Sequence, residues 1–213
     1  MLSLALVAAT SAAAAAVPTG SVVSSTDLDA PHKIRSGIVI GLSLGAGIVG
    51  ASGYPNEWAK IGNPDYYSSS GWMTGSGEGL FVMGALTDYL SFGFWYAHAG
   101  ASNPHWQSTG SGVGLRVELF PLYGIERWRG LGLVGQFGLG SGDLSAKVPN
   151  LPSSEGTSSF AAAGVFHEWA FRFLGGHFAA GPSLEYSAIW SQAFERHGLA
   201  LSARLVFYGG GGG

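Results

Sequence analysis

The sequence predicts an all-β protein, an eight-stranded antiparallel up-and-down transmembrane β-barrel. Three observations lead to this fold class. Apolar residues make up 46% of the 213 residues and charged residues only 11%, whereas a soluble domain carries about 25% charged residues. In the body of the chain, no unbroken apolar run reaches the roughly 20 residues of a transmembrane helix. Instead, apolar residues alternate with small or polar ones, as in strands with two unlike faces.

Eight alternating segments follow one another along the body of the chain. Each is at least as long as the roughly 9–11 residues with which a tilted strand crosses a bilayer. The links after odd-numbered segments are polar and mostly long, and those after even-numbered segments are shorter, which is typical of outer-membrane barrels. An even strand count places both termini on the short-turn, periplasmic side. The segments are 35–52, 74–87, 89–101, 110–121, 130–143, 158–173, 177–190 and 196–208.

The ends of the chain differ in composition from this body. Residues 1–16, MLSLALVAATSAAAAA, are apolar and end in small residues, which predicts a secretory signal peptide. Residues 17–34 are polar and predict a disordered periplasmic lead-in, and residues 209–213 form a glycine tail. The chain has no cysteine, which excludes disulfides and thiolate metal sites. A net charge of -3 gives no indication of a nucleic-acid partner.

The stretch GVGLRVELF, residues 112–120, shows how charge is distributed over the strands. Val113, Leu115, Val117 and Leu119 fall on one face, and Arg116 and Glu118 fall on the other. Because an eight-stranded barrel is just wide enough for side chains to fill, we expect mid-strand charges to form a hydrogen-bonded network that plugs the lumen. Arg196 is expected outside this network, at a loop end. The predicted lumen charges are Glu78, Arg116, Glu118, Glu168, Arg172, Glu185 and Arg204.

One of the segments leaves its two faces undecided. The segment 74–87 is ambiguous, because Phe81 and Met83 alternate with Leu80 and Val82. A soluble sandwich or lipocalin-like barrel is the alternative fold, but its charged outer face would require many more charges.

Trp and Tyr residues near segment ends are typical of interfacial girdles. They are Tyr89, Tyr123, Trp128 and Tyr208 on one side, and Trp72, Tyr96 and Trp190 on the other.

On this pattern, residues 35–208 resemble the small bacterial outer-membrane β-barrels, the eight-stranded class that includes the OmpA transmembrane domain and OmpX. The last segment, HGLALSARLVFY at 197–208, is similar to the C-terminal assembly signal of that family, and the glycine tail departs from it. The resemblance implies an outer-membrane location, contact with membrane lipids and lipopolysaccharide, and recognition of residues 197–208 by the barrel assembly machinery.

The resemblance also implies a plugged barrel with a structural or surface-interaction role. An extracellular ligand would then bind at the loops 53–73 and 144–157. A conduit for small hydrophobic molecules, as in OmpW-like barrels, is an alternative that the sequence does not separate from this one.

A second alternative is a lipid A-modifying acyl hydrolase or transferase at the outer leaflet. His98, Ser111 and Asp143 lie near the loop ends of three successive segments, on the outward face. A hydroxyl, a base and an orienting acid suit acyl transfer. The deacylase pattern of His and Ser two residues apart on one strand is missing from the sequence. No cofactor is expected, and the histidines show no metal-ligand spacing.

Overall fold

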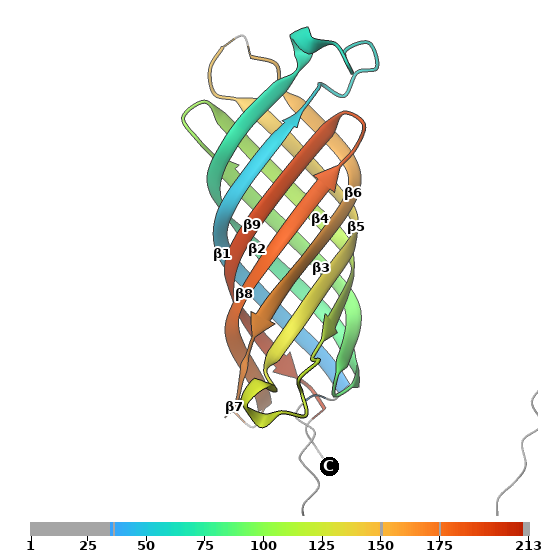
Figure 1. The fold of residues 1–213 in the computed structure, drawn as a ribbon, viewed down its shortest axis with the longest axis vertical. Coiled ribbons are helices and arrows are strands. Elements are labelled where there is room, and N and C mark those ends of the chain that lie inside the picture. Colours follow the sequence, from blue (N-terminus) through green and yellow to red (C-terminus); the bar gives the residue numbers. More distant parts are fainter. Residues whose placement is uncertain (1–34, 36, 150, 175, 211–213) are drawn as a thin grey trace, which may run out of the picture. The chain divides into compact units, whose positions relative to one another are not determined.

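The computed structural model describes residue 35 and residues 37–149, 151–174 and 176–210, and strands dominate this part of the chain (Figure 1). The predicted signal peptide, the lead-in and residues 211–213 of the glycine tail lie outside the described residues. No helix of the described part is long and apolar enough to span a membrane. The strands are β1 (Gly37–Gly53), β2 (Ser68–Thr87), β3 (Leu90–Ser102), β4 (Trp106–Leu119), β5 (Leu131–Ala146), β6 (Ser154–His167), β7 (Trp169–Phe173), β8 (Gly176–Trp190) and β9 (Phe194–Tyr208).

These strands close into an antiparallel barrel. Neighbours in sequence pair from β1 to β6, β9 pairs with both β1 and β8, and β6 pairs with β8. The short strand β7 continues β6 in the same register against β8, so the two form one interrupted strand and the wall has eight. The predicted fold class is therefore confirmed. We call the end that holds Gly37 and Tyr208 the terminal end, and the opposite end the loop end.

The connections alternate between the two ends. At the loop end they are residues 54–67, 103–105, 147–153 and 191–193, and the first contains the 3-10 helix η2 (Pro64–Tyr66). The predicted loops 53–73 and 144–157 are wider than these, because the neighbouring strands extend into both ranges. At the terminal end, the connection after β4 is the longest and contains the 3-10 helix η3 (Glu126–Trp128).

The outer wall is apolar, and the lumen holds small and charged residues together with large apolar ones. Outward Leu44, Leu139 and Leu201 are exposed, whereas inward Val39 and Val206 are fully buried. The faces predicted within residues 112–120 are those seen in the structure, because Arg116 and Glu118 are buried whereas Val113 and Leu119 are exposed.

The structure resolves the ambiguity of β2 and corrects the placement of Glu78. Phe81 and Met83 are buried in the lumen, and Leu80 and Val82 are exposed. Glu78 shares the parity of Leu80 and is exposed, so its predicted place in the lumen is wrong. The physical reason is that large apolar side chains also fill this lumen, so that on β2 apolar character alone does not mark the lipid face.

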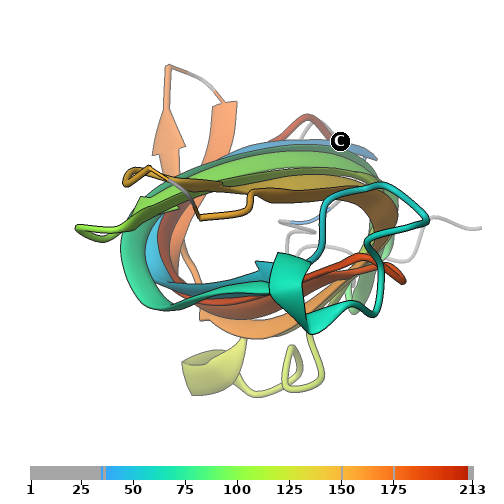
Figure 2. The same cartoon turned by 90° about the horizontal axis from the view of Figure 1, so that it is seen from above.

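The hairpin formed by β7 and β8 leaves the barrel wall at the terminal end. The last pair between β5 and β6 joins Leu131 to His167, and beyond it the described part of β7 pairs with β8 alone. Figure 2 shows this hairpin, in orange, standing out from the barrel. Arg172 on β7 is exposed, so its predicted place in the lumen is also wrong. Its parity is inward, but no wall lies opposite it.

Candidate functional site

The terminal half of the lumen is organised around Glu118, whose carboxylate is fully buried and binds two arginines. Arg116, on the same strand, donates from Nε and Nη2 to Glu118 Oε1 at 2.9 and 2.7 Å. Arg204 on β9 donates from Nη2 to Glu118 Oε2 at 3.0 Å. Each carboxylate oxygen therefore accepts a charge-assisted hydrogen bond, which is what a buried carboxylate requires.

Toward the terminal end the network continues to Glu168 and Arg35. Arg204 Nη2 lies 3.4 Å from Glu168 Oε2, and Arg35 donates from Nη2 to Glu168 Oε1 at 2.7 Å. The Tyr208 hydroxyl donates to the same Oε1 at 2.6 Å. Tyr208 is thus buried in the lumen and is not part of the predicted interfacial girdle.

Arg35 closes this end of the lumen from a position before β1. Its Nη1 also donates to the carbonyl oxygen of Arg129 at 3.1 Å. Burial acts to lower the pKa of the Arg35 guanidinium, but the interactions with Glu168 and Tyr208 together outweigh burial and hold that pKa above its ordinary value. Arg35 therefore carries a full positive charge beside Glu168.

Toward the loop end the network reaches Glu185 and Gln136. Arg116 Nη1 lies 3.8 Å from Glu185 Oε2, and the Gln136 amide donates to that oxygen at 3.0 Å. Across its full length the network holds equal numbers of the two charges, so it is neutral. Its charged members are Arg35, Arg116 and Arg204 with Glu118, Glu168 and Glu185.

Each arginine of the network also lies over the ring of a buried phenylalanine. The guanidinium carbon is 3.6 Å from the ring centroid for Arg35 over Phe120, and 3.7 Å for Arg204 over Phe166. For Arg116 over Phe81 the distance is 4.3 Å. Such cation–π contacts gain strength when they are desolvated. For Arg204, whose buried Nε and Nη1 have no hydrogen-bond partner among the described residues, the Phe166 ring is a further contact of the guanidinium.

The loop half of the lumen is filled mainly by apolar side chains. Trp95 and Phe160 pack with ring centroids 4.4 Å apart, and Leu144, Ile189 and Phe194 are almost fully buried. Arg196 lies near the loop end, as expected, but its side chain is buried inside the lumen. It donates from Nε to Ser108 Oγ at 3.3 Å and from Nη2 to the Ala99 carbonyl oxygen at 3.1 Å.

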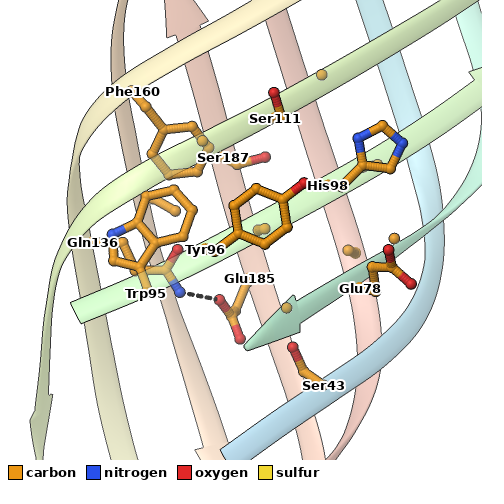
Figure 3. A pocket seen from close by; sticks show the side chains of 18 of the residues that line it. Ser43, Glu78, Trp95, Tyr96, His98, Ser111, Gln136, Phe160, Glu185 and Ser187 are labelled. Atoms are coloured by element: carbon orange, nitrogen blue, oxygen red, sulfur yellow. Dashed lines mark hydrogen bonds between the residues drawn. The ribbon is translucent and has the colours of Figure 1, made fainter. Parts of the chain in front are cut away.

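A cavity of about 120 Å³ separates the two halves. Arg116, Gln136 and Glu185 line it from the terminal half, and Phe160, Ile189 and Arg196 line it from the loop half. Figure 3 shows the hydrogen bond between Gln136 and Glu185, together with Trp95, which lines the same cavity. The buried Trp95 Nε1 has no hydrogen-bond partner in the described part of the chain.

The predicted catalytic candidates lie on adjacent strands but do not form a triad. His98 and Ser111 are register partners between β3 and β4. The Ser111 hydroxyl lies 3.0 Å from that of Ser141, and the Asp143 carboxylate binds Thr109 and Ser145. Among the described residues, no hydrogen bond links His98, Ser111 and Asp143 to one another, and no cluster of acidic or histidine side chains is suited to a metal ion.

The sequence predictions for the lumen missed three members of the network. Gln136 and Tyr208 have inward parity on β5 and β9, but Gln136 carries no charge and Tyr208 is predicted to lie in the interfacial girdle. Arg35 precedes β1 but is the first residue of the predicted segment 35–52, and it shares the parity of inward Val39. The prediction covers mid-strand charges only, and including the first residue of the segment is the signal that finds Arg35.

Among known proteins, the chain is similar to solved structures. No protein-family model and no curated protein sequence matches the chain. Among solved structures, Ail, the attachment invasion locus protein of Yersinia pestis, matches with a TM-score of 0.51 and 13% identity, over 81% of this chain and all 100% of Ail. Neisserial surface protein A matches with a TM-score of 0.47 and 12% identity, over 81% and 97% of the two chains. OprG from Pseudomonas aeruginosa matches with a TM-score of 0.40 and 7% identity, over 83% and 98%.

These identities are low, so the likeness concerns the fold. With the closed eight-stranded wall, the match to Ail confirms the predicted resemblance to small bacterial outer-membrane β-barrels.

Proposed function

We propose that this outer-membrane-type barrel resides in the bacterial outer membrane as a non-conducting scaffold that presents its loop end to the cell exterior. The observation that carries the proposal is the filled lumen. The Arg–Glu network occupies the terminal half, and apolar side chains occupy the loop half. The bore of an eight-stranded barrel is only wide enough for side chains, so this packing argues against a permanent channel.

The loop end offers a surface for interaction. Residues 54–67 form an ordered loop in which the Tyr54 and Tyr67 rings lie 5.3 Å apart, and Asn63 caps η2 by accepting from Asp65 N at 3.1 Å. Trp58 on this loop is 82% exposed. A large aromatic side chain held on a preorganised loop is typical of interaction surfaces. We therefore propose residues 54–67, with the loop 147–153, as the site of an extracellular ligand.

Two further parts of the proposal concern partners. The exposed apolar belt supports contact with outer-membrane lipids and lipopolysaccharide. Residues 197–208, which make up most of β9, are proposed as the segment that the barrel assembly machinery recognises. The conduit is less well supported because the lumen is filled. For the lipid A-modifying enzyme, His98, Ser111 and Asp143 line one pocket on the outer face, but the Ser111 hydroxyl and the Asp143 carboxylate bind other neighbours rather than one another.

The test combines fractionation with conductance measurement. The protein is expected to sediment with outer membranes, to migrate differently on unboiled gels, and to give no steady conductance in planar bilayers. Recovery as a soluble periplasmic monomer would contradict the location. A steady, large conductance from the wild-type protein would contradict the closed lumen and would favour the conduit. Lipid A mass spectrometry with and without the protein is the corresponding check on the enzyme, and we expect an unchanged profile.

A further inference from the structure

We infer that the β7–β8 hairpin is a membrane-interface anchor whose aromatic face packs against phospholipid at the periplasmic surface of the bilayer. The inference rests on the outer-membrane location proposed above. It concerns a part of the barrel that takes no part in closing the lumen and that lies at the opposite end from the loops.

The hairpin carries a continuous aromatic face. Trp169, Phe171 and Phe173 alternate along β7 and are exposed. The rings of Phe171 and Phe173 lie 6.0 and 6.1 Å from the ring of Phe178 on β8. Phe178 in turn lies 5.2 Å from Phe207 on β9. The rings thus form a cluster across three strands.

This aromatic face continues the lipid-facing surface of the barrel. Phe171 pairs with Phe178, and Phe178 pairs with Phe207, so the three share one row of the sheet. Phe207 has the same parity on β9 as Leu201 and Leu205, which are exposed on the outer wall. The belt therefore extends past the point where the wall is closed, onto a hairpin that has no apolar layer over it in the described structure.

The opposite face of the hairpin carries one arginine, Arg172. In the next row, Arg172 pairs with His177, and His177 pairs with Tyr208, which points into the lumen. Arg172 therefore lies on the side away from the aromatic rings, and it is exposed. An element with aromatic residues on one face and arginine on the other lies in the membrane interface, with its rings toward the acyl chains and its cation toward phosphates.

The backbone of β7 sets the depth of the hairpin. One edge of β7 pairs with β8, and no strand of the described chain pairs with the other. Unpaired backbone groups are costly in hydrocarbon, so this edge belongs among hydrated headgroups rather than in the acyl-chain layer. A free edge is also a template for strand addition by another protein, which the experiment below separates from lipid contact.

The absence of cysteine from the chain allows a direct test by site-specific labelling. Phe171→Cys and Ala170→Cys place an environment-sensitive fluorophore at adjacent exposed positions on the two faces of β7. Val148→Cys, exposed at the loop end, is the control. Each variant is folded into vesicles of phosphatidylethanolamine and phosphatidylglycerol, with and without spin-labelled lipid. We expect a blue-shifted emission and strong quenching at position 171, weaker quenching at 170, and water-like emission at 148.

Two outcomes would overturn the inference. One is water-like emission at both 170 and 171 in a barrel whose gel shift shows that it has folded into the vesicles. The other is a blue shift at 171 that occurs only after a periplasmic extract is added, which would indicate strand addition by a protein. Failure of the wild-type protein to reach outer membranes would instead contradict the proposed location, so the two failures are distinguishable. Arg172→Ser provides a further readout. The wild-type protein should prefer vesicles with phosphatidylglycerol to neutral vesicles, and this variant should lose that preference.

Discussion

The two halves of the lumen accommodate buried charge in different ways. In the terminal half, three arginines and three glutamates neutralise one another through a chain of direct contacts from Arg35 to Glu185. In the loop half, Arg196 lies among apolar side chains and is bound by a hydroxyl and a carbonyl oxygen. A buried charge can thus be satisfied by an opposite charge or by neutral acceptors. Removing the side chain leaves another charge unpaired only where its partner was an opposite charge.

Glycines make room for the large side chains in both halves. A Cβ at Gly41 would overlap the ring of Phe81, over which Arg116 lies. A Cβ at Gly110 would lie 2.8 Å from Arg196 Nη1. The glycine content of the strands therefore has a steric role, because it lets bulky groups fit in a narrow lumen.

The largest effect is expected in the terminal half, from Glu118→Ala. This substitution leaves the buried guanidinium groups of Arg116 and Arg204 without their shared carboxylate, at a cost of about 3–5 kcal/mol in the free energy of unfolding. Urea titration in lipid vesicles measures it. Glu155→Ala, at an exposed position, is the matched control and should change stability by less than about 0.5 kcal/mol. Equal stability of the two variants would show that the network contributes nothing measurable.

A second substitution introduces a guanidinium at the position before Arg116, which lies on the opposite face of β4. Leu115→Arg on the lipid side should destabilise the barrel by about 2–4 kcal/mol if the residue lies near the midplane of the bilayer, because a charge there is poorly solvated. Val117→Arg should act similarly. The same titration applies, and wild-type stability of both variants would contradict the assignment of inner and outer faces.

The smallest effect is expected in the loop half, from Arg196→Met. This change keeps most of the volume and removes the hydrogen bonds to Ser108 and Ala99. It breaks no direct ion pair among the described residues, because Asp143 acts on Arg196 only at longer range and is itself bound by Thr109 and Ser145. We expect a loss of about 1.5–3 kcal/mol, the range for hydrogen bonds to a charged group. Arg116→Met, in the terminal half, should cost more, and the reverse order would contradict the distinction between the two halves.

Much of the architecture was predictable because the period of two is a local property of a strand. The alternation at residues 112–120 placed Leu115 outside and Arg116 and Glu118 inside without any knowledge of their neighbours. The same rule placed Glu185 and Arg204 on the inner face, where the structure has them. It does not say which charges touch, since Arg204 and Glu118 meet only because β9 and β4 face each other across the lumen.

The sequence by itself determined the strand order, the closed wall and most inner faces, because hydrophobic alternation and link length are local properties of the chain that do not depend on its tertiary contacts. Tertiary structure decided the rest. The parity of Arg172 is inward, but the wall opposite β7 has ended, so an inner face no longer exists there. Glu78 lies outside because pairing with β1 and β3 sets the phase of β2. Arg35 enters the lumen because Glu168, far away in sequence, lies there to receive it.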